Sequence, residues 1–531
     1  MSNNQPREIT NISYRDETLT LKDGIKLKSR IWLPNHSGPW PALLMRQPYG
    51  REIASSVTYA HPSWWATNGY LVIIQDVRGQ GESQGEFKGF SQEAADTTET
   101  HSWARSLKEC NGKLGTYGFS YQGFTQLVAL KDTPPPDCIA TAMTGLEEKR
   151  HWSCDGNAYW WHLGLAWGLQ LAALQAKRNN NQEAWTTIRR SLENGDYLRT
   201  GIQLLEKYDP NGMAYQWFLT SNQPEGPFKT HKPLNSWFKT PMLLIGTWWD
   251  PHLRGILDIY QKSISIGGKP ELHIGPGSHL EWWEGAQSLH LRFFDSHLKI
   301  NKNLEYSESQ KNLWNISTKQ WLQNKPRSQV ESPHWGLFSQ GGACFDINEG
   351  TIKADTTGEG WCELVHDPWR PVPSQGGHLS LEPGLVERDQ IDSRFDVAKF
   401  TSAPQRKNVE LVGIPSLELC IKSDQQGFDI CVALSIISKS TLKANQISTG
   451  FLRVIGKEAK ENKKRKVFLQ PICATVKSEE QIRISISGSS WPAIGINHGD
   501  GQTPPGPSNL NSLVITLRVD LKQSKLEILE F

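Results

Sequence analysis

The stretch TYGFSYQG, residues 116–123, decides the fold that this sequence predicts. Residues 113–117 have the pattern of a short strand, and residues 124–130 have the pattern of a buried helix start. Gly118 and Gly123 allow the sharp strand-to-helix turn that exposes a serine hydroxyl, here that of Ser120. Because a serine attacks only when it is exposed and a base removes its proton, Ser120 is the candidate nucleophile.

A literal search for the pattern G-x-S-x-G selects a different serine. The motif GESQG at residues 81–85 contains Ser83, which follows the predicted strand at residues 70–77. The residues after Ser83 are polar and glycine-rich, and they lack the apolar helix pattern that this motif requires. We therefore interpret Ser83 as a residue of a glycine-rich loop.

Bulk composition excludes several classes of protein. A chain of 531 residues is too long for one hydrophobic core, so roughly two to four domains are expected. The net charge of +2 gives no reason to expect nucleic-acid binding, and the basic run at residues 463–466 is interpreted as a solvated hairpin tip. No apolar stretch is long enough to span a membrane, and the polar N-terminus lacks a signal core, so a cytoplasmic protein is expected.

The eight cysteines are scattered and contain no C-x-x-C pair. In a long chain without a signal segment, such cysteines are expected to be free and mostly buried thiols. No residue spacing typical of metal ligands stands out. We therefore expect neither a metal nor another cofactor.

Three regions of the chain differ in pattern. Continuous apolar runs typical of strands covered on both faces alternate with helix patterns such as residues 92–108, which predicts a doubly wound α/β domain. The runs lie at residues 42–46, 71–74, 241–246 and 271–275. Residues 146–235 are rich in helix formers and tryptophan, which predicts a helical cap. From about residue 330 short alternating strands recur, which predicts a β-sandwich with jelly-roll topology. The predicted division is an α/β domain over 1–145 and 236–329, a cap over 146–235 and a jelly roll over 330–531.

A serine nucleophile needs an imidazole as base and a carboxylate that orients the imidazole. Two predicted strands downstream of Ser120 end in loops that carry Asp250 and His279, in the order Ser, Asp, His that α/β-hydrolases use. Asp258 is a rival acid, but it lies in a helix pattern. Nearby rival histidines are His252, His273, His290 and His297. Position alone favours Asp250 and His279 without excluding these rivals.

Several motifs, in order along the chain, resemble the signatures of the cocaine esterase and X-Pro dipeptidyl-peptidase family, which includes α-amino-acid ester hydrolases. The N-terminal motifs are RQPY at 46–49, QDVRGQGESQGEF at 75–87, GFSYQG at 118–123, WWD at 248–250 and GPGSH at 275–279. The C-terminal motifs are DPWRPVP at 367–373, GG at 376–377 and FTSAP at 400–404. The resemblance extends from about residue 15 to the end of the chain.

This resemblance implies an α/β-hydrolase core, a helical cap and a C-terminal jelly roll. It implies that Ser120, Asp250 and His279 form a catalytic triad. It further implies an oxyanion hole made of the Tyr49 hydroxyl and the backbone N–H of Tyr121, two donors that stabilise the charge of the transition state. One departure concerns the residue two before the histidine, because this chain has Gly277 where the family usually has tryptophan.

The expected reaction is acyl transfer to water through an acyl-Ser120 intermediate, on a small ester, amide or short peptide. Four tryptophans in adjacent pairs are candidates to line the substrate pocket, although core packing explains each of them equally well. They are Trp160, Trp161, Trp248 and Trp249. The sequence is compatible with a homo-oligomer.

Two other functions stay open. An X-Pro dipeptidyl-peptidase or α-amino-acid ester hydrolase would need a carboxylate to hold a free α-amino group, and Glu147, Glu148 and Asp155 at the start of the cap are candidates. Charges at a helix start are more often simply solvated. Alternatively, the chain is a binding protein with a lectin-like jelly roll and an inert hydrolase domain, although all the expected catalytic groups are present.

Overall fold

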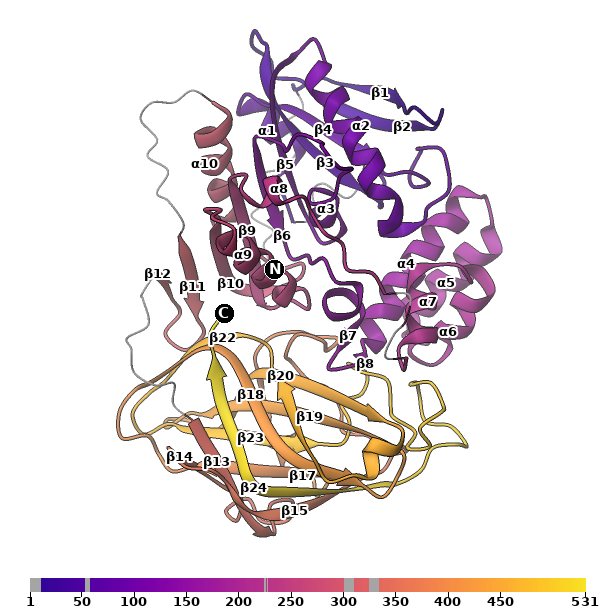
Figure 1. Ribbon diagram of the computed structural model, residues 1–531. Coiled ribbons are helices and arrows are strands. Elements are labelled where there is room, and N and C mark those ends of the chain that lie inside the picture. The colour runs from indigo at the N-terminus through magenta and orange to yellow at the C-terminus, as the bar shows by residue number, and fades with distance from the viewer. Residues whose placement is uncertain (1–10, 53–57, 224–225, 227, 300–309, 324–333) are drawn as a thin grey trace.

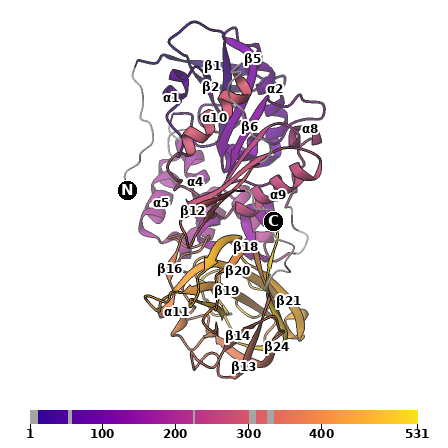
Figure 2. The ribbon, with the colours of Figure 1, turned by 90° about the vertical axis from the view of Figure 1, so that its left-hand side faces the viewer.

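The computed structural model describes residues 11–52, 58–223, 226, 228–299, 310–323 and 334–531. An α/β part lies above, an all-β part lies below, and a group of helices lies beside the sheet and above the all-β part (Figure 1). The side view keeps the same two levels (Figure 2). The predicted combination of an α/β core, a helical cap and a C-terminal all-β domain is therefore confirmed.

The α/β part is built on a ten-stranded sheet with the order β1-β2-β4-β3-β5-β6-β9-β10-β11-β12. The strands from β4 to β11 in this order run parallel, while β1, β2 and β12 pair antiparallel at the two ends. The strands are β1 (Tyr14–Thr20), β2 (Lys26–Trp32), β3 (Trp40–Gln47), β4 (Leu71–Asp76), β5 (Cys110–Phe119), β6 (Cys138–Ala142), β9 (Met242–Trp249), β10 (Glu271–Ser278), β11 (Lys311–Asn315) and β12 (Gln320–Gln323).

Helices cover this sheet, and the central strands are buried along most of their length. This burial is the reason that their sequences are continuous apolar runs and do not alternate. The helices are α1 (Pro62–Thr67), α2 (Glu93–Ser106), α3 (Tyr121–Thr125), α8 (Asn235–Phe238), α9 (Leu253–Ser265) and α10 (Ala286–Leu298), with a 3₁₀ turn, η2 (Gly89–Gln92). The predicted helix at residues 92–108 is confirmed as α2.

The helix predicted over residues 124–130 is wrong in its extent. Helix α3 begins directly after Ser120 and ends at Thr125, although Leu127 beyond it is fully buried as expected. The side-chain amide of Gln126 donates to the carbonyls of Gly118 and Gln122. A side chain thus supplies hydrogen bonds that further helical backbone would otherwise make, and the helix stops.

The cap consists of a π-helical turn, a two-stranded ladder and four helices. These elements are η3 (Lys149–Ser153), β7 (Cys154–Asp155), β8 (Ala158–Tyr159), α4 (Trp161–Arg178), α5 (Gln182–Asn194), α6 (Tyr197–Tyr208) and α7 (Met213–Thr220). Helix α4 reaches the loops after β4, where Gln175 Nε2 donates to the Gly79 carbonyl at 2.8 Å and Arg178 Nη1 donates to the Gly81 carbonyl at 2.7 Å. The exact domain boundaries given above stay a prediction.

The remaining strands form the all-β domain, interrupted in its described part only by the short turns α11 (Asp389–Asp392) and η4 (Lys457–Lys460). Its jelly-roll connectivity stays a prediction. The strands are β13 (His334–Gly341), β14 (Thr351–Ala354), β15 (Glu359–His366), β16 (Val386–Glu387), β17 (Val397–Ser402), β18 (Val409–Ser423), β19 (Gly427–Ile437), β20 (Ala444–Ile455), β21 (Lys463–Phe468), β22 (Ile472–Val476), β23 (Gln481–Ser487) and β24 (Ile515–Leu529).

The basic run at residues 463–466 lies within strand β21 and not at a hairpin tip, so that prediction is wrong. Strand β21 pairs antiparallel with β18. Lys464 pairs with Glu418 on β18, and Lys466 pairs with Glu527 on β24, which lies on the far side of β18 in the sheet. These cross-strand ion pairs offset the like charges and make the basic run compatible with a strand.

The α/β part and the all-β domain share one hydrophobic cluster. This cluster includes Trp248 and Leu253 from the α/β part, and Leu469 and Cys473 from the all-β domain. The interface between the two parts is therefore packed like an interior. All eight cysteines are free and six are buried, as predicted. Among the described residues, no helix has both the length and the apolar character needed to cross a membrane.

Buried neutral histidines make the fold sensitive to acid. Burial lowers the pKa of His290 to about 4, whereas an unfolded histidine has a pKa of about 6.5. Between about pH 6.5 and pH 4 the unfolded chain binds a proton there and the folded chain does not, so acid favours unfolding. We expect His290 to lower the free energy of unfolding by up to about 1.4 kcal/mol per pH unit in this window, with no effect above it.

Denaturant unfolding at several pH values tests this expectation. The variant His290→Leu should show a shallower loss of stability between about pH 6.5 and pH 4 than the wild type. His36 is exposed, so His36→Leu serves as the control and should keep the wild-type slope. Equal slopes for all three proteins would contradict the assignment.

Candidate active site

Ser120 occupies a strained turn between β5 and α3. Its backbone has φ 57° and ψ −128°, an unusual conformation for a residue other than glycine. Its N–H lies 3.0 Å from the Ala142 carbonyl and 3.1 Å from the Met143 carbonyl, contacts that hold the turn against β6. Gly118 has φ 148°, and a Cβ there would lie 2.5 Å from the Cβ of Gln122. The turn thus requires glycine at this position, as the sequence predicts.

Asp250 and His279 meet at the carboxyl edge of the same sheet. They follow β9 and β10, which are adjacent parallel strands. His279 Nδ1 lies 2.6 Å from Asp250 Oδ1, and Asp250 is fully buried. A carboxylate can only accept a hydrogen bond, so it selects the imidazole tautomer with a proton on Nδ1. The lone pair of Nε2 is then available to act as a base.

The rival residues have other partners. Asp258 accepts hydrogen bonds from Arg150 and His151. His252 bonds through Nδ1 to the carbonyl of His151 at 2.6 Å, and burial lowers its pKa to about 4. His273 contacts Glu271, and Nδ1 of His290 contacts the carbonyl of Ala286. Among the described residues, His279 is the histidine that is hydrogen-bonded to Asp250.

The loop of His279 lies next to Ser120 through the residue that precedes the serine. The rings of Phe119 and His279 have centroids 5.3 Å apart. The hydroxyl of Ser120 contacts the hydroxyl of Tyr49. Among the described residues, the Ser120 hydroxyl makes no hydrogen bond to His279. Bonds between a nucleophile and its base are often long in sites without substrate.

Tyr49 follows β3 at this sheet edge, and the cap orients its hydroxyl. Trp167 on α4 donates its indole N–H to Tyr49 Oη at 3.2 Å. Because an indole nitrogen can only donate, the oxygen of Tyr49 accepts here and its own proton can point to Ser120. Burial raises the pKa of Tyr49 to about 12, so the hydroxyl keeps its proton at neutral pH.

Tyr121 is the first residue of α3, and its side chain anchors the turn. Its hydroxyl donates to Glu93 at 2.9 Å, and Glu93 forms an ion pair with Arg46. Its ring stacks on Phe90 with centroids 5.1 Å apart. The first amides of a helix have no partner within the helix, so the backbone N–H of Tyr121 is available to a ligand beside Ser120.

Two models of protein families match this chain. The family model of the X-Pro dipeptidyl-peptidase (S15 family) matches residues 23–281, and the model of the X-Pro dipeptidyl-peptidase C-terminal non-catalytic domain matches residues 303–521. The chain belongs to the X-Pro dipeptidyl-peptidase S15 family. It is thus a member of a family of hydrolases.

Individual relatives of this S15-family chain are distant in sequence and similar in fold. It is 24% identical over 457 residues to the cocaine esterase of Rhodococcus sp. (strain MB1 Bresler), covering 78% of each chain. Its structure resembles an α-amino acid ester hydrolase with a TM-score of 0.73 at 16% identity, covering 99% and 98% of the two chains. It also resembles an aminopeptidase from a marine sediment Thaumarchaeota archaeon, with a TM-score of 0.72 at 17% identity over 99% of both chains.

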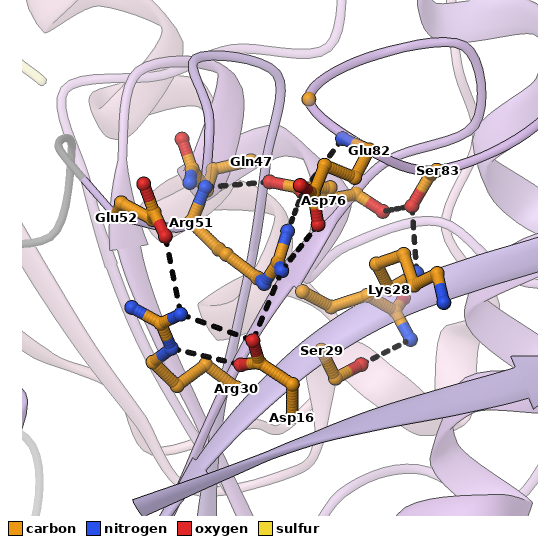
Figure 3. A network of polar contacts seen from close by, with 12 residues as sticks. Asp16, Lys28, Ser29, Arg30, Gln47, Arg51, Glu52, Asp76, Glu82 and Ser83 are labelled. Carbon is orange, nitrogen blue, oxygen red and sulfur yellow. Dashed lines mark hydrogen bonds and ion pairs between the residues drawn. The ribbon is translucent and has the colours of Figure 1, made fainter.

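In this S15-family chain, Ser83 is a structural residue, in agreement with its interpretation from the sequence. Its hydroxyl donates to the Asp76 carbonyl at 2.7 Å and accepts from the Lys28 N–H at 2.8 Å (Figure 3). The surrounding network is held by Arg51, which pairs with Asp76 and Glu82. The side chain of Ser83 is fully buried, so the literal motif marks a packed loop.

The tryptophans named from the sequence pack mainly in the interior. Trp248 is 1% exposed and donates to the Trp314 carbonyl. Trp161 is also 1% exposed and donates to the Leu198 carbonyl within the cap. Trp160 is buried at the boundary between the cap and the all-β domain, and Trp249 is half-buried. For Trp161 and Trp248, core packing is the better interpretation.

Two other tryptophans of the cap, which the sequence does not single out, lie close to the site. Trp152 lies 4.5 Å from His252 and 5.9 Å from Trp167, measured between ring centroids. Trp167 reaches Tyr49 as described above. Their sequence signal is weak, because neither belongs to an adjacent pair and helix periodicity does not say which helix face meets the sheet edge.

The acidic residues at the start of the cap are all engaged. Glu147 pairs with Arg150. Glu148 is 7% exposed and accepts hydrogen bonds from Trp217 and His231. Asp155 is 5% exposed and pairs with Arg254 and His378. Each carboxylate thus has partners within the protein that a ligand ammonium would have to replace.

In the part of the chain that the structure describes, two clusters each bring three potential metal-ligating atoms within 4.8 Å of one another. One joins Asp250, His252 and His279, and in it Asp250 and His279 are already hydrogen-bonded to each other. The other joins Glu147, His151 and Asp258, and Arg150 contacts both of its carboxylates. The existing bonds account for both groupings without a metal.

Gly277, the departure from the family pattern, is required by its own turn. Its φ is +120°, and a Cβ there would lie 2.0 Å from the carbonyl oxygen of Glu281. That carbonyl accepts the N–H of Ser278 at 3.1 Å, directly before His279. The loop can therefore hold His279 in this conformation only with glycine at position 277.

Removal of the Tyr49 hydroxyl should slow catalysis and leave substrate binding nearly unchanged. For Tyr49→Phe we expect kcat to fall by about 10²–10³-fold with a small change in KM, because the oxyanion donor that the family resemblance implies for Tyr49 acts mainly on the transition state. Steady-state kinetics with a chromogenic ester measure both quantities. The control is Tyr117→Phe, since the buried Tyr117 hydroxyl has no hydrogen-bond partner among the described residues. An unchanged kcat in Tyr49→Phe would exclude this donor role.

Proposed function

We propose that this protein is a serine hydrolase that cleaves ester or amide bonds through an acyl-Ser120 intermediate. The observation that carries the proposal is the 2.6 Å contact of His279 with Asp250, at the sheet edge where Ser120 occupies its strained turn. Parallel strands β5, β9 and β10 deliver these three residues from distant parts of the sequence. A Ser-His-Asp triad catalyses this reaction without a cofactor.

Each residue has a role in the proposed reaction. Nε2 of His279 takes the proton of Ser120 as the serine oxygen attacks the carbonyl carbon, and then gives it to the leaving group. Asp250 holds the imidazole in the Nδ1–H tautomer and stabilises its protonated form. The Tyr49 hydroxyl and the Tyr121 N–H donate to the oxyanion. His279 then activates a water molecule in the same way, and this water attacks the acyl-enzyme, which releases the carboxylic acid and restores Ser120.

The pairing of the cap carboxylates supports a hydrolase that does not require a free α-amino group. Glu147, Glu148 and Asp155 are occupied by side chains of the protein. Small esters, amides and short peptides are therefore the proposed substrates. Location in the cytoplasm and assembly into a homo-oligomer stay predictions.

A fluorophosphonate probe tests the proposed mechanism, because it reacts covalently with an activated serine. We expect the folded wild type to be labelled, Ser120→Ala to be unlabelled, and the control Ser83→Ala to be labelled like the wild type. An unlabelled wild type would support the inert binding protein. Labelling that persists in Ser120→Ala would assign the nucleophile to another residue.

A pair of substrates tests the preference for esters. We expect cleavage of p-nitrophenyl acetate, which has no amino group, at a higher kcat/KM than a Gly-Pro chromogenic amide. Acetylation of the amino group of the second substrate should change its rate little. Cleavage of the free Gly-Pro amide alone would instead identify an X-Pro dipeptidyl-peptidase.

A further inference from the structure

We infer that Gln470 of the all-β domain is a positioning residue for Asp250; the inference rests on the proposed triad. Gln470 Nε2 lies 2.7 Å from the Asp250 carbonyl oxygen and 3.4 Å from that of Trp248. The first of these bonds joins residues 220 positions apart in the sequence. Gln470 is 2% exposed, so the bond is made in a dry interior, where it holds its geometry well.

Gln470 helps to satisfy the backbone of this loop. Strand β6 pairs with β9 only as far as Ile245, so the last residues of β9 and the loop after it extend beyond that neighbour. An unpaired carbonyl in a buried loop costs free energy. The side-chain amide of Gln470 satisfies the Asp250 carbonyl, and the N–H of Leu253 contributes a second bond at 3.2 Å. The loop thus takes a fixed path out of the sheet.

Gln470 is itself held firmly. It lies between β21 and β22, and its N–H donates to the Thr449 carbonyl at 2.8 Å. Its own carbonyl accepts the hydroxyl of Ser448 at 2.6 Å. The preceding residue, Leu469, is fully buried. The glutamine therefore transmits the position of β20 to the loop of Asp250.

A second contact ties the start of helix α9, which directly follows this loop, to the same segment. Arg254 donates through Nη2 to the carbonyl of Phe468 at 2.8 Å. Its Nη1 lies 3.0 Å from Asp155 of the cap, and Asp155 also contacts His378 of the all-β domain at 3.1 Å. Residues 468–470 thus contact both the loop of Asp250 and the helix that follows it, and Asp155 of the cap joins the second contact.

The consequence concerns the orientation of the carboxylate. Asp250 reaches His279 from a loop whose path depends on contacts with the all-β domain. Displacement of a group by about 1 Å can lower a catalytic rate by about 10²-fold. The all-β domain thus contributes to the rate through the position of Asp250, which is compatible with the description of its family model as a non-catalytic domain.

The variant Gln470→Met tests the inference, since methionine keeps the length of the side chain and lacks the donor. We expect kcat for p-nitrophenyl acetate to fall by about 10–100-fold, with KM nearly unchanged. The acid limb of the pH–rate profile should move to lower pH, because a displaced carboxylate stabilises the protonated imidazole less. In proton NMR spectra, the downfield resonance of the His279 Nδ1–H should shift or broaden.

The matched control is Gln446→Met. Gln446 is 1% exposed in the same domain, and its Nε2 donates to the Gln375 carbonyl at 2.7 Å, away from the acid loop. Oε1 of Gln446 also accepts a hydrogen bond from Arg388 Nη1 at 2.8 Å, so Gln446→Met should lose at least as much stability as Gln470→Met, but only Gln470→Met should lose rate. A folded Gln470→Met protein with wild-type kcat and an unchanged resonance would overturn the inference.

A second variant covers the case in which Gln470→Met does not fold. Gln470→Asn keeps the amide but shortens its reach, and it should show the same changes in kcat and in the pH–rate profile. The two proposals fail in different ways. Absence of fluorophosphonate labelling in the wild type rejects the serine mechanism, whereas normal labelling rates in wild type, Gln470→Met and Gln470→Asn reject the role of Gln470.

Discussion

The variant Ser120→Ala is expected to lower kcat for p-nitrophenyl acetate by about 10⁶-fold, to near the background rate of the site. Alanine removes the only atom that forms the acyl bond in the proposed mechanism, and it leaves the oxyanion donors in place. Residual catalysis by these donors is expected to stay well above the rate in water. Stopped assays over long times, with protein purified separately from wild-type enzyme, measure the remaining activity.

The matched control is Ser83→Ala, at the serine of the literal motif. Ser83 is fully buried and both donates and accepts a hydrogen bond, so its loss should cost about 1–3 kcal/mol of stability. The kcat of the folded fraction should stay close to that of the wild type. A large loss of kcat in folded Ser83→Ala, together with activity in Ser120→Ala, would reverse the two assignments.

The second large effect concerns the acid. For Asp250→Asn we expect kcat to fall by about 10⁴-fold with little change in KM. The asparagine amide can donate to Nδ1 of His279, which would place the imidazole proton on Nε2 and remove the base. Steady-state kinetics measure the loss, and far-UV circular dichroism checks that the fold is kept.

Asp258→Asn is the control for this experiment. Asp258 is the rival acid, 46% exposed in its side chain and bonded to Arg150 and His151. The kcat of Asp258→Asn should stay within a few-fold of that of the wild type. If Asp258→Asn instead lost as much activity as Asp250→Asn, the contact of Asp250 with His279 would not be sufficient to identify the acid.

The sequence predicts the elements of the site where local pattern determines them. Ser120 follows a strand pattern and lies between two glycines, Gly118 and Gly123, and Asp250 and His279 directly follow apolar strands. Because the carboxyl ends of parallel strands share one edge of the sheet, local patterns are enough to place these residues near one another. The long apolar strands are predictable for a similar reason, since burial on both faces leaves a clear signal.

The residues that support the site cannot be predicted in this way. Trp167 contacts Tyr49 from the cap, and Gln470 contacts Asp250 from the all-β domain. These contacts depend on how separate units dock, which periodicity within one helix or strand does not determine. The prediction for the basic run in β21 is wrong for a related reason, because its glutamate partners come from other strands.

The shared hydrophobic cluster between the α/β part and the all-β domain has a consequence for attempts to shorten the enzyme. Cutting the chain between the two would expose a large apolar surface on each fragment, with Trp248 exposed on one and Leu469 on the other. Each fragment would be prone to aggregate before its activity could be assayed. A shortened version of this hydrolase would first require polar substitutions on the surface that the cut exposes.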